Sequence, residues 1–362
     1  MARKLLFYTH ALVGGGAERV FARLASGFAA KGDEVHFTVD FDASEARPLL
    51  SEAVSFRVLP KGHAAATRAL ARWIAYEKPD ASLSAISVSN LKHTAAAVWA
   101  GRGRRAILTY HGYWESESER LSRLGYDLTP LSSRLTGATV AVSEGLRADL
   151  VARFRASPSR TLTIFNPAAP EPAPAPVSRE DLASRPPTIV AIGRLAPDKD
   201  FSTLLRAFAR LNSPGARLRI LGEGPLRPAL SEEASALGIA DRLEMPGFVA
   251  DIGAHLGRAR CVAVSSRRES FSLACVEALA HGLPVAATDC GGPRELLPSE
   301  ALGRIVPIGD AEALSRALQT LLEFPGDPAP RQSHAAGFSL ESALDRYGAL
   351  IDAVIRHGAP RG

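Results

Sequence analysis

The segment from Cys261 to Leu297 constrains the fold of this chain more than any other part of the sequence. It is predicted to form a buried strand at Cys261–Val264, a polar loop, a helix of about ten residues from Ser272, and a second strand at 284–288. Two strands joined through a helix lie parallel in one sheet. Parallel sheets bind ligands beyond the carboxyl ends of their strands, where this loop must lie. The segment therefore predicts a parallel α/β domain with a binding site beside the loop.

The start of that helix is predicted to bind an anion. The backbone N–H groups of Phe271, Ser272 and Leu273 lie in or just before its first turn, where amides lack intrahelical partners and the helix dipole is positive. Two carboxylates flank this position, Glu269 before the helix and Glu277 inside it. Both could reach the hydroxyls of a ligand whose phosphates the helix holds. The alternative is that Glu269 only caps the dipole and Glu277 is solvated.

A second junction between strand and loop brings two cations to the same kind of edge. The predicted strand Thr188–Ile192 runs into Gly193 and Arg194, and Lys199 follows at the entrance of a helix. Two fixed cations can neutralise the charge that develops on a departing diphosphate, in place of a metal ion. The alternative is a pair of surface cations in a loop.

Strands and helices alternate on both sides of a proline-rich segment. Before it, strands are predicted at 4–8, 34–39, 55–59, 80–85, 106–110, 138–142 and 160–165, and helices at 17–31, 65–77, 89–100, 117–135 and 144–154. Residues 166–176, NPAAPEPAPAP, cannot continue a helix or a central strand and favour an extended linker. We therefore predict two doubly wound α/β domains, 1–167 and 188–339, with a linker at 168–187. A capping signal begins a long amphipathic helix in the final segment, 340–362.

Composition and charge narrow the class of protein. Three cysteines without a C-x-x-C pair indicate a reducing compartment rather than a disulfide or zinc scaffold. No signal peptide precedes the first strand and no apolar run reaches the ~18 residues of a membrane span, so we expect a cytoplasmic protein. Residues 1–167 carry 22 Lys/Arg against 15 Asp/Glu, or +7, and the remainder 21 against 23, or −2. The basic half favours peripheral binding to the anionic inner face of the plasma membrane, or is an arginine-rich solvated surface. Nucleic-acid binding is not expected, because no stacking aromatics accompany the arginines.

The motifs of the second half together resemble a known family. Glu269-Ser-Phe-Ser-Leu-Ala-Cys-Val-Glu277 resembles the E-x7-E signature of the retaining GT-B glycosyltransferases of family 4, of the type that builds bacterial polysaccharides and glycolipids. In that family the first Glu faces the donor sugar and the second faces the nucleotide ribose. The sequence pattern G-R-L-x-x-x-K, which contains Arg194 and Lys199, matches the family's diphosphate-binding cations. Many members have glycine where this chain has Ser270 and Ser272, so the backbone is less free here.

The first half of the sequence contains motifs that resemble the same family less strongly. A glycine run follows the first strand and resembles the family's glycine-rich loop facing the donor, with a ligand-free tight turn as the alternative. His111 follows the strand 106–110 and resembles the family's histidine that contacts the transferred sugar. Asp40-Phe41-Asp42 spells the D-x-D metal–diphosphate motif of a different glycosyltransferase fold, and we interpret it as a loop. The donor-binding residues that the resemblance implies are Gly14, Gly15, Gly16, Gly193, Gly222, Gly247, Phe271, Ser272, Leu273 and Glu277.

The resemblance implies a GT-B fold, in which two doubly wound Rossmann-like domains face each other across a cleft and the helix of 340–362 crosses back to the first domain. It implies a retaining enzyme that moves a sugar from UDP or GDP to a glycan or polyprenyl-linked acceptor by front-face transfer. We expect no cofactor and no metal ion. The alternatives are a catalytically silent nucleotide-binding scaffold subunit and a sugar-nucleotide epimerase. The implied catalytic residues are His111, Glu269, Arg194 and Lys199.

Overall fold

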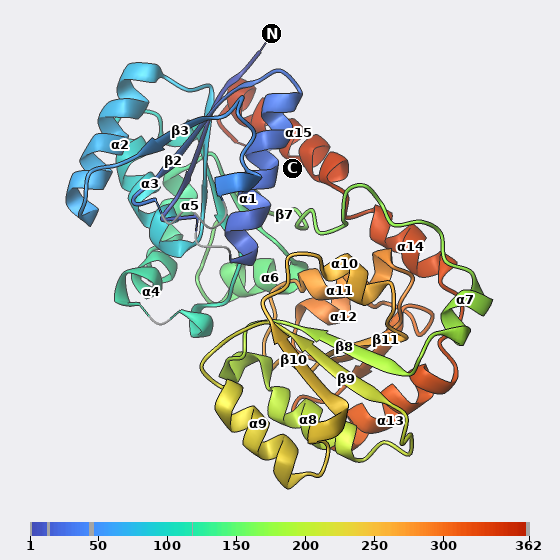
Figure 1. Cartoon of the computed structure of the whole chain (residues 1–362). Helices are drawn as coiled ribbons and strands as arrows, with labels where there is room; N and C mark the ends of the chain where they lie inside the picture. The colour runs from blue at the N-terminus through green and yellow to red at the C-terminus, as the bar shows by residue number, and fades with distance from the viewer. Residues whose placement is uncertain (1, 13–14, 43–46, 118, 360–362) are drawn as a thin grey trace. The chain divides into compact units, whose positions relative to one another are not determined.

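The computed structural model of this chain forms two compact units, each a parallel sheet with helices packed on it (Figure 1). The first unit comprises residues 1–167 and 340–362, and the second comprises 168–339. The segment at 168–187 that the sequence predicts as a linker thus belongs to the second unit. The residues that the structure describes are 2–12, 15–42, 47–117 and 119–359.

The first unit has a seven-stranded sheet in the order β3-β2-β1-β4-β5-β6-β7, so the strand order reverses between β1 and β4. Its strands are β1 (Lys4–Thr9), β2 (Glu34–Val39), β3 (Ser55–Val58), β4 (Ala81–Ala85), β5 (Ala106–Tyr110), β6 (Ala138–Ala141) and β7 (Thr161–Thr163). Its α-helices are α1 (Gly16–Ala30), α2 (His63–Glu77), α3 (Ser87–Trp99), α4 (Arg120–Asp127), α5 (Thr129–Leu135), α6 (Glu144–Ala152) and α15 (Leu340–His357).

Alternate side chains of β1 pack against two layers of helices. Leu6 and Tyr8 lie in a core cluster with residues of α2 and α3. Phe7, which points to the other face, contacts Phe21 of α1 at 4.9 Å between ring centroids. Helix α15 packs on α1, where a Cβ on Gly27 would lie only 2.7 Å from a methyl group of Leu344. The sheet is therefore covered on both faces, and the C-terminal helix belongs to this unit.

The predicted single helix at 117–135 is wrong. The structure has two helices there, α4 and α5, with Leu128 between them. Pro130 is the cause, because proline has no backbone N–H to donate and its ring would clash with the carbonyl of residue 126 in a continuous helix. Proline is tolerated in the first turn of a helix, and Pro130 occupies that position in α5.

The second unit has a six-stranded sheet in the order β10-β9-β8-β11-β12-β13, with its reversal between β8 and β11. Its strands are β8 (Thr188–Ile192), β9 (Arg217–Leu221), β10 (Leu243–Gly247), β11 (Cys261–Val264), β12 (Val285–Thr288) and β13 (Gly303–Val306). Its α-helices are α7 (Arg179–Ser184), α8 (Phe201–Ala209), α9 (Arg227–Ala236), α10 (Ile252–Leu256), α11 (Leu273–Ala280), α12 (Gly292–Leu296), α13 (Ala311–Glu323) and α14 (Ala329–Ala336).

The predicted fold class of two doubly wound parallel α/β domains is confirmed. The remaining short elements are the 3-10 helices η1 (Arg47–Leu49), η2 (Gly103–Arg105), η3 (Trp114–Ser116), η4 (Pro158–Arg160), η5 (Pro197–Lys199) and η6 (Ala240–Arg242). Within the described part of the chain, no helix combines the length and the apolarity that crossing a membrane requires.

Candidate active site

The predicted site residues of the second unit gather at its strand-order reversal. Doubly wound sheets bind ligands beyond the carboxyl ends of their strands at this point. Arg194 and Lys199 lie in the connection that follows β8, and Glu269 lies in the connection that follows β11, the neighbouring strand across the reversal. Two stretches that are far apart in the sequence thus place their charged residues at one edge of the sheet.

Lys199 and Glu269 form an ion pair, which the sequence did not reveal. Lys199 Nζ lies 2.5 Å from Glu269 Oε1, and the Ser266 hydroxyl donates to the same oxygen at 2.9 Å. Both side chains are mostly buried. Burial lowers the pKa of Lys199, but the neighbouring Glu269 carboxylate more than offsets this, so the pKa lies above the ordinary lysine value. Lys199 is therefore a charged ammonium at neutral pH.

Hydrogen bonds to main-chain carbonyls hold the two loops of this pair together. The Ser265 hydroxyl donates to the Lys199 carbonyl at 2.8 Å, and the Arg267 N–H donates to the Asp198 carbonyl at 2.8 Å. Asp200, at φ +46°, ends η5 and caps α8 with its side chain. The turn that carries Lys199 is thus fixed from both ends, which keeps its ammonium in place for a ligand.

Arg194 is exposed, and its loop packs closely against the ends of the neighbouring strands. The Gly222 N–H donates to the Gly247 carbonyl at 2.9 Å, and the Gly193 N–H donates to the Leu221 carbonyl at 3.0 Å. A Cβ on Gly222 would lie 2.0 Å from the Gly193 carbonyl oxygen. Only glycine allows this approach of one backbone to another. Among the described residues, no carboxylate pairs with the Arg194 guanidinium, so this cation is available to an anionic ligand.

Helix α11 begins at Leu273, one residue after the predicted start. Ser272 is its N-cap, at φ +87° and ψ +88°, a conformation that favours glycine. The Phe271 ring is buried and packs edge-on against Phe338 at 5.8 Å. A Cβ on Gly292 would lie 2.2 Å from the Phe271 carbonyl oxygen, so the backbone there is tightly confined. The backbone N–H groups in the first turn of α11 are therefore held in one direction beside the strand-order reversal.

The two predicted acidic residues have different settings. The Glu269 N–H donates to the Cys290 carbonyl at 2.8 Å, and its own carbonyl accepts from the Gly292 N–H at 2.7 Å, which ties it to the loop after β12. Glu277 lies one turn inside α11, on the helix face of Leu273, and its side chain is half-buried. Both carboxyl groups therefore come from the elements that follow β11.

In the first unit, His111 directly follows β5, and its Nε2 lies 2.9 Å from the Thr109 hydroxyl. Burial lowers the pKa of His111 to about 4, so the imidazole is neutral at pH 7. Gly15 is the N-cap of α1 and Gly16 is its first residue, while Gly14 lies outside the described residues. A Cβ on Gly15 would lie 2.3 Å from a Glu18 carboxylate oxygen, so this glycine accommodates a side chain of its own helix.

The first unit also contains a buried ionic cluster that no motif in the sequence predicts. Asp40 follows β2 as part of a loop, but its carboxylate accepts from the Tyr8 hydroxyl at 2.8 Å, lies 2.5 Å from His10 Nδ1, and contacts Lys92 Nζ. Asp42, the second carboxylate of the D-x-D motif, pairs with Arg47. The available signals were a lysine within α3 and the polar residues His10 and Asp40 directly after the strands β1 and β2.

Two family models match the chain, one for each half. The model described as Glycosyl transferases group 1 matches residues 177–336, and the one described as Glycosyltransferase Family 4 matches residues 14–171. The lipopolysaccharide core biosynthesis glycosyltransferase LpsE of Rhizobium meliloti is 28% identical over 324 residues, which cover 85% of this chain and 86% of that protein.

Two further similarities bear on fold and chemistry. The N-acetylgalactosamine-N,N'-diacetylbacillosaminyl-diphospho-undecaprenol 4-alpha-N-acetylgalactosaminyltransferase of Campylobacter jejuni is 31% identical over 182 residues. That match spans 50% of this chain and 49% of the relative. The crystal structure of Anabaena HepE in complex with UDP-glucose aligns with a TM-score of 0.82 over 97% of this chain and 100% of its own, at 19% identity. The last similarity establishes the fold alone.

Proposed function

We propose that this chain, which belongs to the GT-B glycosyltransferases of group 1 and family 4, moves a sugar from UDP or GDP to a glycan or polyprenyl-linked acceptor during bacterial polysaccharide or lipopolysaccharide synthesis. The observation that carries the proposal is the meeting of Arg194, Lys199 and Glu269 at the reversal between β8 and β11. HepE supports the donor class, because it was crystallised with UDP-glucose. The Campylobacter jejuni relative, named for a diphospho-undecaprenol substrate, supports the acceptor class.

The donor diphosphate is assigned to the cations and amides at this reversal. Arg194 and Lys199 supply positive charge, and the amides at the start of α11 supply directed hydrogen bonds. The loop glycines Gly193, Gly222 and Gly247 are assigned to the nucleotide, because glycine lets a ligand approach the backbone, and Glu277 is assigned to the ribose hydroxyls. The fixed cations stabilise the leaving diphosphate without a metal ion.

Transfer is proposed to retain the anomeric configuration. The bond between the anomeric carbon and the diphosphate oxygen breaks, and the acceptor oxygen bonds to the same face of the sugar. The acceptor hydroxyl proton passes to the departing phosphate oxygen. Glu269 Oε1 is occupied by Lys199 and Ser266, so we assign the other carboxylate oxygen to a hydroxyl of the donor sugar. The neutral imidazole of His111 is assigned to the same sugar as a hydrogen-bonding group.

The assay is nucleotide release from UDP-glucose, UDP-galactose, UDP-N-acetylglucosamine and GDP-mannose, with EDTA or Mg²⁺ and a panel of glycoside acceptors. We expect one donor to be consumed in EDTA and the product to keep its anomeric configuration. Arg194→Met should lower kcat by about a hundredfold, because it removes a cation from the transition state. Arg206→Met, an exposed cation on α8 of the same unit, should leave the rate unchanged. Nucleotide binding without any turnover would favour a silent scaffold instead.

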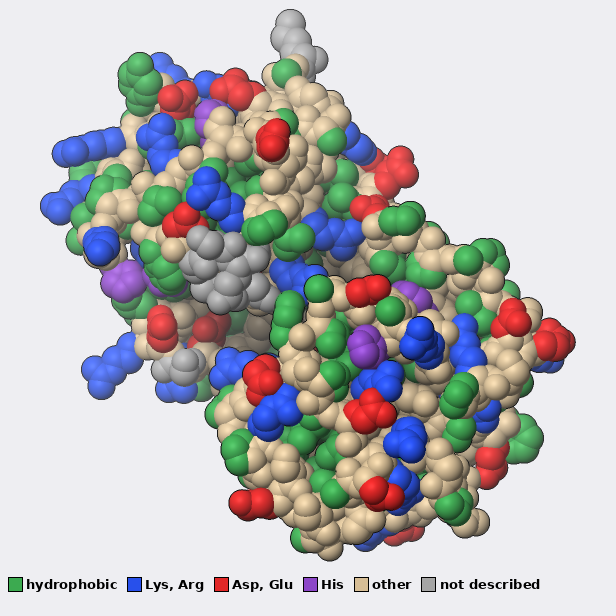
Figure 2. All heavy atoms as spheres, viewed as in Figure 1, with side chains coloured by type: hydrophobic (Ala, Val, Ile, Leu, Met, Phe, Trp, Pro, Cys, Tyr) green, Lys and Arg blue, Asp and Glu red, His purple; other side chains and the backbone are tan. Residues whose placement is uncertain are grey.

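We also propose that the α2–α3 side of the first unit rests on the anionic inner face of the plasma membrane. Arg68, Arg72 and Tyr76 are exposed at successive turns on one face of α2, and Trp99 at the end of α3 is 68% exposed. Figure 2 shows Lys and Arg side chains with hydrophobic ones between them on this side of the unit. Cations and exposed aromatic rings together are what interfacial binding to anionic lipid uses.

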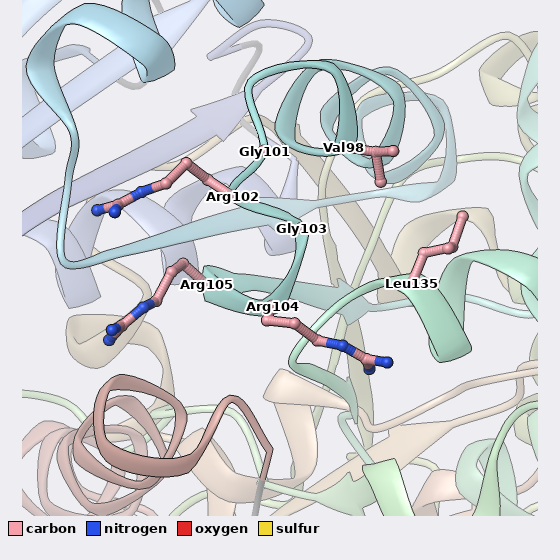
Figure 3. A pocket seen from close by; sticks show the side chains of 7 residues that line it. All are labelled: Val98, Gly101, Arg102, Gly103, Arg104, Arg105 and Leu135. Atoms are coloured by element: carbon pink, nitrogen blue, oxygen red, sulfur yellow. The ribbon is translucent and has the colours of Figure 1, made fainter.

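A pocket of about 290 Å³ adjoins this side, where η2 enters β5 (Figure 3). It lies at the amino end of β5, whereas His111 lies at the carboxyl end. The residues that line the pocket are Val98, Gly101, Arg102, Gly103, Arg104, Arg105 and Leu135.

Co-sedimentation with vesicles of phosphatidylglycerol tests the proposed membrane binding, and vesicles of phosphatidylcholine are the control. Binding to both kinds of vesicle, or to neither, would contradict the proposal.

A further inference from the structure

The first unit has an ionic cluster at its own strand-order reversal that the proposed function does not use. The reversal lies between β1 and β4. His10 directly follows β1, Asp40 directly follows β2, and Lys92 lies on α3, the helix after β4. Tyr8, Asp40 and Lys92 are buried, whereas the His10 side chain is 26% exposed. A reversal is where a doubly wound sheet binds its ligand, and here only His10 reaches solvent.

The contacts of Asp40 orient the His10 ring. Burial raises the pKa of Asp40, but the hydrogen bonds from His10 and Lys92 outweigh it and hold that pKa below its ordinary value. The carboxylate is thus ionised, and the proton in the 2.5 Å contact between the two side chains belongs to His10 Nδ1. Lys92 Nζ lies 3.4 Å from the same nitrogen. Because Nδ1 is the donor to Asp40, Nε2 is the ring nitrogen that is left for a ligand.

Aromatic rings surround the exposed part of His10. Phe41 packs edge-on against it with ring centroids 5.0 Å apart, and Phe41 is 43% exposed. His63, an exposed residue at the start of α2, stacks on it at 6.0 Å. Nε2 lies on the side of the imidazole away from Asp40. An imidazole held in place by buried groups thus lies beside an exposed aromatic face.

We propose that His10 accepts a hydrogen bond at Nε2 from a hydroxyl of the acceptor saccharide, while Phe41 packs against the apolar face of the same sugar ring. Asp40 and Lys92 are positioning residues that keep the imidazole in this tautomer. The inference rests on the proposed function and names the substrate class of the first unit. A neutral sugar fits better than a phosphate, because the Asp40 carboxylate lies directly behind His10 and pairs with the Lys92 ammonium. A few fixed polar groups beside an aromatic surface are typical of small-molecule sites.

The test replaces His10 in two complementary ways. His10→Asn keeps an N–H close to the position of Nδ1, so the bond to Asp40 survives, and removes the group at Nε2. His10→Gln places a polar group near Nε2 instead. The matched control is His36→Asn, because His36 also pairs with a carboxylate in this sheet, Glu34 at 2.9 Å, but at the amino end of β2.

The readout is the KM for octyl glucoside, octyl galactoside and octyl N-acetylglucosaminide, with the KM for the nucleotide sugar measured alongside. His10→Asn should raise the acceptor KM about tenfold, or about 1.4 kcal/mol, and leave the donor KM unchanged. His10→Gln should recover part of this loss, and His36→Asn should match the unaltered protein. Equal acceptor KM values for His10→Asn and His36→Asn would overturn the proposal.

A second readout does not depend on the acceptor. The ¹⁵N spectrum of labelled histidines at pH 7 should show His10 protonated at Nδ1 and bare at Nε2. A proton on Nε2, or on both nitrogens, would overturn the assignment and favour an anionic ligand. Failure of the proposed function is distinguishable, because the unaltered protein would then consume no nucleotide sugar while the histidine spectrum still reports the tautomer.

Discussion

Replacing Lys199 with methionine tests whether its pair with Glu269 stabilises the second unit. The two side chains are 21% and 16% exposed, and the charged atoms lie 2.5 Å apart. Removing one partner of a fully buried pair costs about 3–5 kcal/mol, because the other charge stays buried. Since both groups here keep some contact with water, we expect a loss of about 2–3 kcal/mol. In a unit of this size that corresponds to a fall in Tm of about 4–12 °C.

Calorimetric unfolding measures this change, and the matched control is the double variant Lys199→Met with Glu269→Gln. The double variant should regain most of the lost stability, because no buried carboxylate remains unpaired. It should not regain transferase activity, because the cation is still missing. A Lys199→Met protein that unfolds at the unaltered temperature would refute the reasoning, and so would a double variant as unstable as the single one.

The stability that the pair of Lys199 and Glu269 contributes should depend on pH. The pKa of Lys199 is raised above its ordinary value of 10.5, so the ammonium binds its proton more tightly in the folded protein than in the unfolded chain. The stability that this pKa shift contributes is fully present below about pH 10.5 and is lost as the pH rises through the raised pKa. The difference in Tm between the unaltered protein and Lys199→Met should therefore shrink at strongly alkaline pH. A difference that grows with pH would contradict this.

Three further predictions concern the same unit. Ser272→Gly should raise the free energy of unfolding by about 1 kcal/mol, because φ +87° suits glycine. Urea unfolding of Ser272→Gly and of the comparison variant Ser272→Ala measures this. Gly222→Ala should lower Tm and weaken UDP binding, because its Cβ would lie 2.0 Å from a carbonyl oxygen, whereas Gly215→Ala, which meets no atom within 4 Å, should change neither. Burial raises the pKa of Cys261 and Cys290 to about 12, so Ellman's reagent should react with the thiols only as the protein unfolds, and rapid reaction of the native protein would contradict their burial.

The alternation of strands and helices was predictable because each local segment carries its own pattern. Short apolar runs such as Cys261–Val264 become central strands, and their ends locate Arg194 and Glu269 at the sheet edge without further information. The break near Pro130 was also readable in principle, since proline restricts the helix before it. Local patterns of this kind depend on neighbours a few residues apart.

Contacts between distant residues were not predictable in the same way. Lys199 and Glu269 are 70 positions apart, and Asp40 and Lys92 are 52 apart. The sequence placed Lys199 and Glu269 at one edge, but assigned them to different parts of a ligand rather than to each other. Lys92 gave only the weak signal of a charged residue inside a helix. Which charges pair depends on the strand order, and strand order is a property of the whole sheet.

Calorimetric titration of UDP and GDP in EDTA tests most directly whether the reversal between β8 and β11 is a nucleoside diphosphate site. The proteins to compare are the unaltered chain, Arg194→Met and Arg206→Met. We predict that one nucleotide binds, that Arg194→Met weakens its binding about tenfold or more, and that Arg206→Met binds like the unaltered chain. Absence of binding by the unaltered chain, or equal affinities for all three proteins, would contradict the account.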